Sequence, residues 1–205
     1  MGARCYQTAA MVFEIVQVGD PVLRQAARPL DPAEIATPFI QELIVSMRMT
    51  MYDAPGVGLA APQVGESLQL TVVEDDEEHL ATISPLRRAE TRRTPLPFTV
   101  LINPKLTPLG DETDEFFEGC LSLEGYSALV RRHRAVRVEA LDGRGKPIKL
   151  DLEGWPARIV QHELDHLAGV LYVDRMDTRT FTTGENLGRW WKARPASEVR
   201  ARLTP

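Results

Sequence analysis

The chain has 205 residues, of which 43% are hydrophobic and 26% charged. This is the balance of a soluble globular protein that is large enough to bury a core. Its 24 Lys and Arg against 29 Asp and Glu give a net charge of −5, which excludes a broadly basic nucleic-acid-binding domain. No apolar run approaches the length of a membrane span. We therefore expect neither a DNA partner nor a membrane partner.

The two cysteines, Cys5 and Cys120, are too few for a disulfide framework. Residues 1–11 hold one Arg and no continuous apolar stretch, so a secretory signal is not predicted. A reducing compartment fits both observations, and we expect the protein in the cytoplasm. If the N-terminus was processed from a transit peptide, a mitochondrion or plastid is the alternative location.

In the first third of the chain, a turn at Gly19–Pro21 is followed by one long predicted helix. Asp31 is placed to cap its start, with Pro32 in the first turn and Glu34 completing a capping box. The helix is expected to end near Asp53, because apolar residues recur every four positions up to that point. Its buried face would carry Ile35, Phe39, Leu43, Met47 and Met51.

The middle of the chain is predicted to hold short strands and one charged loop. Gln69–Val73 has strand character, and residues 74–97 combine an acidic run with arginines among prolines. We expect this stretch to be a solvated loop, in which the acidic and basic blocks can also pair. His79 within it is expected to be exposed. Three further segments have strand character: Thr99–Ile102, Ala135–Leu141 and Pro147–Leu152.

A second helix is predicted over Gly154–Ala168, with Pro156 in its first turn and Gly169 ending it. Leu171–Val173 is expected to add a short strand. These elements predict an α+β fold, a single domain in which antiparallel β-strands pack around this central helix. Residues 185–205 form a basic tail.

The second helix carries a His-Glu-x-x-His motif at His162, Glu163 and His166. Histidines four positions apart lie on one helical face with their Cβ atoms about 5–6 Å apart, close enough to bind one cation. Glu163 follows the first histidine and can take a proton from bound water. The plainer alternative is a helix whose two histidines are solvated or packed in the core.

A zinc-type hydrolase needs a third protein ligand and leaves one position for water. The metzincin pattern is excluded, because Tyr172 stands where its third histidine belongs. Glu185 lies in the range of a thermolysin-like glutamate and stays a candidate. The other candidate is Cys120, because a thiolate is a soft ligand and the preceding Gly119 permits close backbone approach. An isolated cysteine is also often a small buried apolar residue.

Three segments together resemble the signature motifs of the peptide deformylases, in the same order. They are Gly56-Val57-Gly58-Leu59-Ala60-Ala61-Pro62-Gln63, Glu118-Gly119-Cys120-Leu121-Ser122 and Gln161-His162-Glu163-Leu164-Asp165-His166-Leu167. The resemblance implies a catalytic domain over residues 12–184, with an N-terminal extension, 1–11, and the basic tail, 185–205. It also implies a metal-dependent hydrolase that removes the N-formyl group from the N-terminal formyl-methionine of newly synthesised proteins and releases formate.

The resemblance implies a role for each matching position. Cys120, His162 and His166 would hold the metal. Glu163 would be the general acid and base, while the Gln63 amide and the backbone N–H of Leu121 would donate hydrogen bonds to the oxyanion. Without the resemblance, Gln63 is equally a loop-fixing amide. The substrate groove and the methionine pocket would be lined by Val57, Gly58, Gly119 and Ile159.

Two imidazoles and a thiolate favour zinc on ligand chemistry alone. The resemblance instead implies Fe(II), with zinc, nickel or cobalt able to occupy the same site. The implied partners are N-formylmethionyl peptides and nascent chains, and the basic tail suggests a weak contact with ribosomal RNA. Two other functions stay open: a general metallopeptidase that uses Glu185, and a metal-stabilised module that binds nascent chain ends without catalysis.

Overall fold

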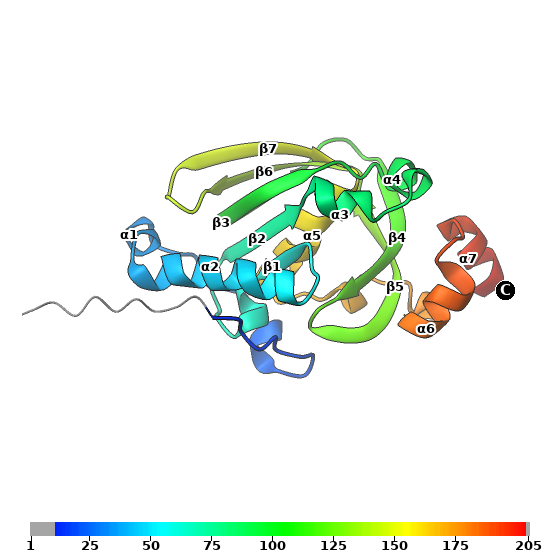
Figure 1. Ribbon diagram of the computed structural model, residues 1–205, viewed down its shortest axis with the longest axis horizontal. Helices are drawn as coiled ribbons and strands as arrows, with labels where there is room; N and C mark the ends of the chain where they lie inside the picture. The colour runs from blue at the N-terminus through cyan, green and yellow to red at the C-terminus, as the bar shows by residue number, and fades with distance from the viewer. Residues whose placement is uncertain (1–10, 204–205) are drawn as a thin grey trace, which may run out of the picture.

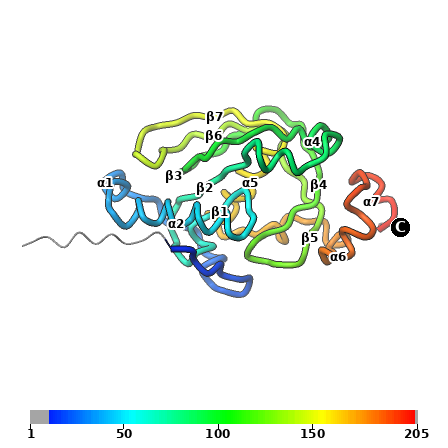
Figure 2. The backbone as a smooth tube through the Cα atoms, viewed as in Figure 1, coloured from blue at the N-terminus to red at the C-terminus, as the bar shows by residue number. Residues whose placement is uncertain are grey.

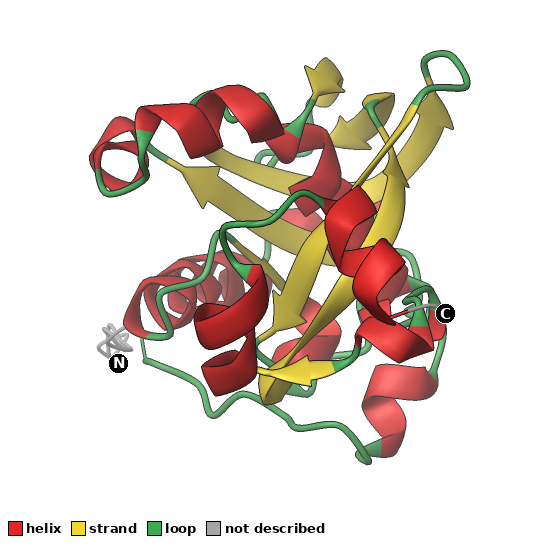
Figure 3. Ribbon diagram, turned by 90° about the vertical axis from the view of Figure 1, so that its right-hand side faces the viewer, coloured by secondary structure: helices red, strands yellow, loops and turns green. Residues whose placement is uncertain are grey.

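The computed structural model describes residues 11–203. Two antiparallel sheets form its frame, a large one with the strand order β1-β2-β3-β6-β7 and a small one with the order β4-β5-β8. The strands occupy the middle of the molecule, with most helices around them (Figures 1 and 3). The expected α+β class is confirmed. The strands span Gly58–Ala60 (β1), Leu70–Asp75 (β2), Leu96–Pro108 (β3), Thr113–Cys120 (β4), Leu123–His133 (β5), Ala135–Leu141 (β6), Pro147–Glu153 (β7) and Thr182–Thr183 (β8).

One helix, α5 (Trp155–Leu167), contacts strands of both sheets and is the predicted central helix. Gly154 precedes it at a φ of +64° and Gly169 follows it at +72°, conformations that glycine adopts without a steric penalty. The remaining helices lie toward the outside (Figure 1). They span Pro32–Ile35 (α1), Pro38–Asp53 (α2), Glu77–Ala81 (α3), Pro85–Thr91 (α4), Gly184–Asn186 (α6) and Ala196–Leu203 (α7).

The single long helix predicted from Asp31 is wrong, because the structure has two helices there. The capping box at the start of α1 is present: the Asp31 side chain accepts a hydrogen bond from the first turn, and Glu34 accepts the Asp31 N–H at 2.8 Å. The chain then turns and restarts at Pro38, since proline supplies no N–H to continue a helix. Phe39, expected in the core, is 55% exposed, and Ile40 is buried in its place.

The predicted solvated loop over 74–97 is also wrong, because it contains the end of β2 and the helices α3 and α4. Its expected pairing of acidic and basic blocks does occur. Arg93 donates to the buried Asp75 at 2.7 and 3.0 Å, and His79 lies 2.9 Å from the same carboxylate with a partly exposed side chain. Helices of 5 and 7 residues are too short to show a helical repeat in the sequence.

Two further element predictions need correction. Leu171–Val173 is not a strand: a 3-10 turn spans Tyr172–Asp174, and the Asp174 side chain accepts the Leu171 N–H at 2.8 Å. The strand predicted at Thr99–Ile102 is the centre of a longer one, β3, which continues past Pro104 because the register of its pairing with β6 shifts there. Such a shift lets proline occupy a strand without removing a ladder hydrogen bond.

The C-terminal helix α7 lies at the end of the molecule away from α1, as the backbone trace shows (Figure 2). At the C-terminal end, α7 buries Val199 completely. Its Arg200 forms ion pairs with Glu115 of β4 at 2.5 Å and with Asp177 at 2.8 Å. Helix α7 is thus folded against the small sheet. Within residues 11–203, we find no helix with the length and apolar character of a membrane span.

Candidate metal centre and cavity

One sulfur and two nitrogen donors converge where the end of β4 meets α5. Cys120 is the last residue of β4, and His162 and His166 lie one turn apart on α5. Their donor atoms all lie within 4.8 Å of one another, and Cys120 Sγ is 3.2 Å from His166 Nε2. Among the described residues this is the one group of three or more candidate metal ligands. Glu185 lies on α6, outside this group.

The donor set fits a first-row transition metal, because catalytic sites for such ions use three protein ligands of the imidazole and thiolate type. Glu118 Oε2 lies 3.0 Å from His162 Nδ1. A carboxylate at one ring nitrogen orients the imidazole and leaves its other nitrogen for a metal. His166 is only 1% exposed, and its Nδ1 has no hydrogen-bond partner in the described part of the chain.

A buried ionic network stands behind the ligands. Glu118 accepts hydrogen bonds from Arg132 at 2.9 and 3.0 Å and from Arg158 at 2.6 Å. Arg132 also pairs with Asp165 of α5. Burial alone would raise the pKa of Glu118, but hydrogen bonds from Arg132 and His162 lower this pKa well below its usual range. The carboxylate is therefore ionised and able to hold the His162 ring.

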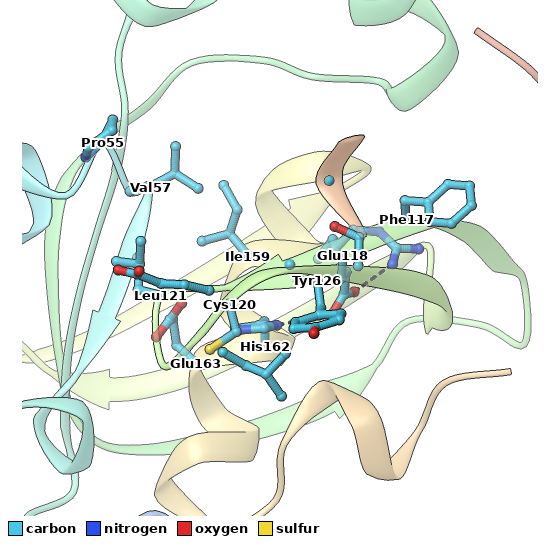
Figure 4. Close-up of a pocket in the computed structure, with 18 of the residues that line it drawn as sticks. Pro55, Val57, Phe117, Glu118, Cys120, Leu121, Tyr126, Ile159, His162 and Glu163 are labelled. Carbon is cyan, nitrogen blue, oxygen red and sulfur yellow. Dashed lines mark hydrogen bonds and ion pairs between the residues drawn. The ribbon is translucent and has the colours of Figure 1, made fainter. Parts of the chain in front are cut away.

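Glu163 lies beside the ligands and faces the cavity (Figure 4). Its side chain is almost fully buried, and Oε2 has no hydrogen-bond partner among the residues described. Burial raises the pKa of Glu163 to about 7. Gly58 of β1 makes room for this carboxylate, because a Cβ at position 58 would lie 2.3 Å from Glu163 Oε1. A carboxyl with such a pKa can exchange protons near neutral pH.

Gln63 sits in a 3-10 turn, Ala61–Val64, directly after β1. Its Oε1 accepts the Ala60 N–H at 2.9 Å, which fixes the loop. Its Nε2 lies 3.3 Å from Ser122 Oγ and 3.6 Å from Cys120 Sγ. One side-chain amide thus fixes the loop through its oxygen and presents N–H groups toward the metal ligands.

The cavity in front of these groups has a volume of about 570 Å³. The predicted pocket residues Val57, Gly58, Gly119 and Ile159 all line it, as does Trp155 (Figure 4 labels Val57 and Ile159). Tyr126 lines the cavity and stacks on Phe181 with ring centroids 5.0 Å apart. The cavity combines an apolar wall with polar groups from Cys120, His162 and Glu163, as ligand sites in proteins do.

Sequence reasoning missed Glu118, Arg132 and Ser122. Glu118 stands two residues before Cys120 and was visible as part of a motif, but its contact with His162 depends on how β4 packs against α5. The sequence around Arg132 is a run of basic residues typical of a surface. Only the sheet register places Arg132 inward while its neighbour Arg131 stays exposed.

The sequence profile of polypeptide deformylases matches residues 12–181. Peptide deformylase 1A, chloroplastic, of Solanum lycopersicum is 49% identical over 174 residues, which are 85% of this chain and 63% of that protein. Peptide deformylase 1 of Streptomyces coelicolor is 46% identical over 177 residues, which are 86% of this chain and 79% of that protein. The chain thus spans less than two thirds of the tomato relative.

The solved structures that resemble this chain are also peptide deformylases. The class I type b peptide deformylase of Acinetobacter baumannii with Met-Ala-Ser bound superposes with a TM-score of 0.72 at 31% identity, covering 82% of this chain and all of that one. The peptide deformylase of Synechococcus elongatus in complex with actinonin gives a TM-score of 0.68 at 39% identity, with 82% of each chain covered. The profile match over most of the sequence and these likenesses show that the chain belongs to the peptide deformylase family.

Proposed function

We propose that this chain is a metal-dependent hydrolase that removes the N-formyl group from N-terminal formyl-methionine and releases formate. The observation that carries the proposal is the position of Glu163. Its unpartnered carboxylate lies beside the Cys120, His162 and His166 donors at the wall of a cavity of about 570 Å³. Deformylases as a family are metal-dependent, and these three residues would hold the ion.

The resident metal we propose is Fe(II), with zinc, nickel or cobalt able to replace it in the same donor set. Such an ion supplies a Lewis acid and a water molecule of lowered pKa. The proposed site is sensitive to oxidants, because the thiolate is the form of cysteine that oxidants attack and because Fe(II) can be oxidised to Fe(III). Loss of activity in air and its protection under anaerobic conditions are the expected signs of iron at this site.

The protein's own groups carry out the proton transfers and stabilise charge. Glu163 accepts a proton from the attacking water and returns it to the departing amine, a role that suits its raised pKa. The Gln63 amide and the Leu121 N–H donate to the formyl oxygen as negative charge grows there. One such donor is typically worth about 3–4 kcal/mol of transition-state stabilisation.

The rest of the cavity positions the substrate in this proposal. Val57 and Ile159 border the pocket for the methionine side chain, with Trp155 near its rim. Gly58 and Gly119 line the groove that receives the substrate backbone, since residues without a Cβ allow close approach. The Met-Ala-Ser bound to the Acinetobacter baumannii enzyme supports a peptide of this kind as the ligand.

The decisive experiment is anaerobic purification with metal analysis, followed by a formate-release assay on formyl-Met-Ala-Ser. We expect turnover by the native chain and a loss of about 10²–10⁴-fold for Glu163→Ala with the metal retained. Cys120→Ser should lower the metal content, whereas Glu185→Ala should not. Dependence on Glu185 would support the metallopeptidase alternative instead. Formyl-peptide binding without any formate release would support the binding module.

Two finer proposals concern partner and location. Lys192 and Arg189 of the C-terminal segment are cations that can contact ribosomal RNA, where formylated chains emerge. If replacing both by Glu leaves co-sedimentation with ribosomes at low salt unchanged, this contact is absent.

A reducing compartment suits the Cys120 thiolate, so the cytoplasm is the proposed location. A chloroplastic relative from Solanum lycopersicum and a mitochondrial relative from Homo sapiens keep an organelle as the alternative.

A further inference from the structure

A short N-terminal segment, Ile15–Val18, connects the two turns that carry the proposed oxyanion donors. The Val16 N–H donates to the Gln63 carbonyl at 2.9 Å, and the Val18 N–H donates to the Ser122 carbonyl at 2.8 Å. Gln63 and Ser122 lie 59 positions apart in the sequence. Two main-chain hydrogen bonds from one short segment therefore fix the distance between the two turns.

The Gln17 side chain adds a third bond to the same pair of turns. Its Nε2 donates to the Leu121 carbonyl at 3.0 Å and to the Ile15 carbonyl at 3.2 Å, so both amide hydrogens are used. The Leu121 carbonyl and the Leu121 N–H belong to adjacent peptide units. No hydrogen bond among the described residues uses that N–H. Gln17 thus restrains the rotation of a turn whose free N–H borders the cavity.

The segment is itself anchored on both sides. Upstream, the Phe13 N–H donates to Thr50 Oγ1 of α2 at 2.9 Å. Downstream, Asp20 caps a 3-10 turn, Pro21–Arg24, whose Leu23 is 1% exposed. Because both ends are held by packed elements, the segment can impose a position on the two turns rather than follow them.

We propose that Ile15–Val18 is a brace that keeps the Gln63 amide and the Leu121 N–H in register, and that Gln17 is a positioning residue for deformylation. The inference rests on the proposed function, which makes these two groups donors to one oxygen. Each donor contributes only when it reaches the place where charge develops, so their relative position determines whether both contribute. The direct contact between the turns, Gln63 Nε2 to Ser122 Oγ, is long at 3.3 Å. The shorter main-chain hydrogen bonds of the brace therefore fix the distance between the turns more firmly than this contact does.

The test compares Gln17→Glu and Gln17→Ala with Glu14→Ala in the full chain loaded with metal. Gln17→Glu keeps the side-chain length and removes the donor. Glu14 directly precedes the segment, and its exposed side chain makes no hydrogen bond or ion pair among the described residues. For both Gln17 variants we expect kcat to fall about three- to tenfold, less than the loss of a whole oxyanion donor. KM, metal content and unfolding midpoint should stay unchanged, and amide hydrogen exchange over residues 118–123 should accelerate. Glu14→Ala should match the native chain in every readout.

An unchanged kcat in both Gln17 variants would overturn the brace. So would a fall in kcat matched by an equal fall in metal content, because Gln17 would then act on the ligand turn as a whole. The failure of the proposed function looks different. In that case the native chain releases no formate, while the hydrogen-exchange comparison still reports whether Gln17 restrains the turn.

Discussion

The two faces of α5 are both buried, but they are built from opposite chemistry. One face places Ala157 and Val160 against the large sheet in an apolar cluster. The other presents Arg158, His162 and Asp165 to the small sheet. Apolar contacts stabilise the first face without directional requirements. On the second face every charge needs a partner, since an unpaired buried charge is costly.

The apolar face therefore holds the helix in the fold, whereas the ion pairs of the charged face orient its side chains. Glu118 alone contacts three groups of the charged face and its surroundings: Arg132, Arg158 and His162. A change on the apolar face should therefore cost stability only. A change on the charged face should cost both stability and activity.

The largest effect is expected from Arg132→Met, which removes the one arginine that joins Glu118 to Asp165 and leaves these carboxylates to Arg158 and Arg175. Breaking a buried ion pair by removing one member costs about 3–5 kcal/mol, and activity should fall with the loss of His162 orientation. Urea unfolding and formate release measure the two effects. Arg131→Met on the same strand, with a side chain 65% exposed, is the matched control. Equal stability of the two variants would show that the network is not structural.

On the apolar side, Leu101→Ala should destabilise the fold by about 2–5 kcal/mol through the cavity it creates. Leu101 of β3 is fully buried in the cluster that packs on α5. Activity per folded molecule should stay at the native level, with the folded fraction taken from circular dichroism at the assay temperature. A variant that is fully folded but inactive would mean that the two faces are not separable.

Gly58→Ala tests the contact between β1 and Glu163 of α5. The added methyl would overlap Glu163 Oε1, so the carboxylate must move, and a displacement of about 1 Å can cost about 100-fold in rate. Stability should change little, because the site opens onto the cavity. Gly188→Ala, where a Cβ would meet nothing within 4 Å, is the control. Near-native kcat in Gly58→Ala would exclude Glu163 as the proton acceptor in its present position.

The smallest effect is expected at Arg200, which joins α7 to Glu115 and Asp177. Its side chain is 38% exposed, and exposed ion pairs contribute about 0.2–1 kcal/mol. Arg200→Ala should lower the free energy of unfolding within that range and leave kcat unchanged. A loss well above 1 kcal/mol in thermal and urea unfolding would show that the C-terminal segment is an integral part of the core.

Much of the site could be predicted from the sequence because its groups lie in short local patterns. A helical repeat puts His162 and His166 on one face, and the order of three motifs points to Cys120 as their partner. The structure brings Cys120, His162 and His166 together, and the predicted cavity residues line one cavity. The catalytic roles of Glu163, Gln63 and Leu121 stay predictions.

The remainder depended on contacts between distant segments. No pattern in the sequence near Arg132 predicts that its side chain is buried, because its partner Asp165 is 33 positions away. The break before Pro38 was readable from its missing N–H, whereas α3 and α4 were too short to show a repeat. The hydrogen bond from Gln17 to Leu121 joins residues 104 positions apart, so no sequence window contains it.

Cys120 belongs to the small sheet, whereas both histidines lie on the helix that is packed into the large sheet. An ion bound by these residues would link the small sheet to that helix. Chelation would then remove one link between β4 and α5 and leave the buried ion pairs of Glu118 and Arg132 as the remaining polar links. Because an ion that binds only the folded state stabilises that state, metal removal should lower the free energy of unfolding of the whole molecule.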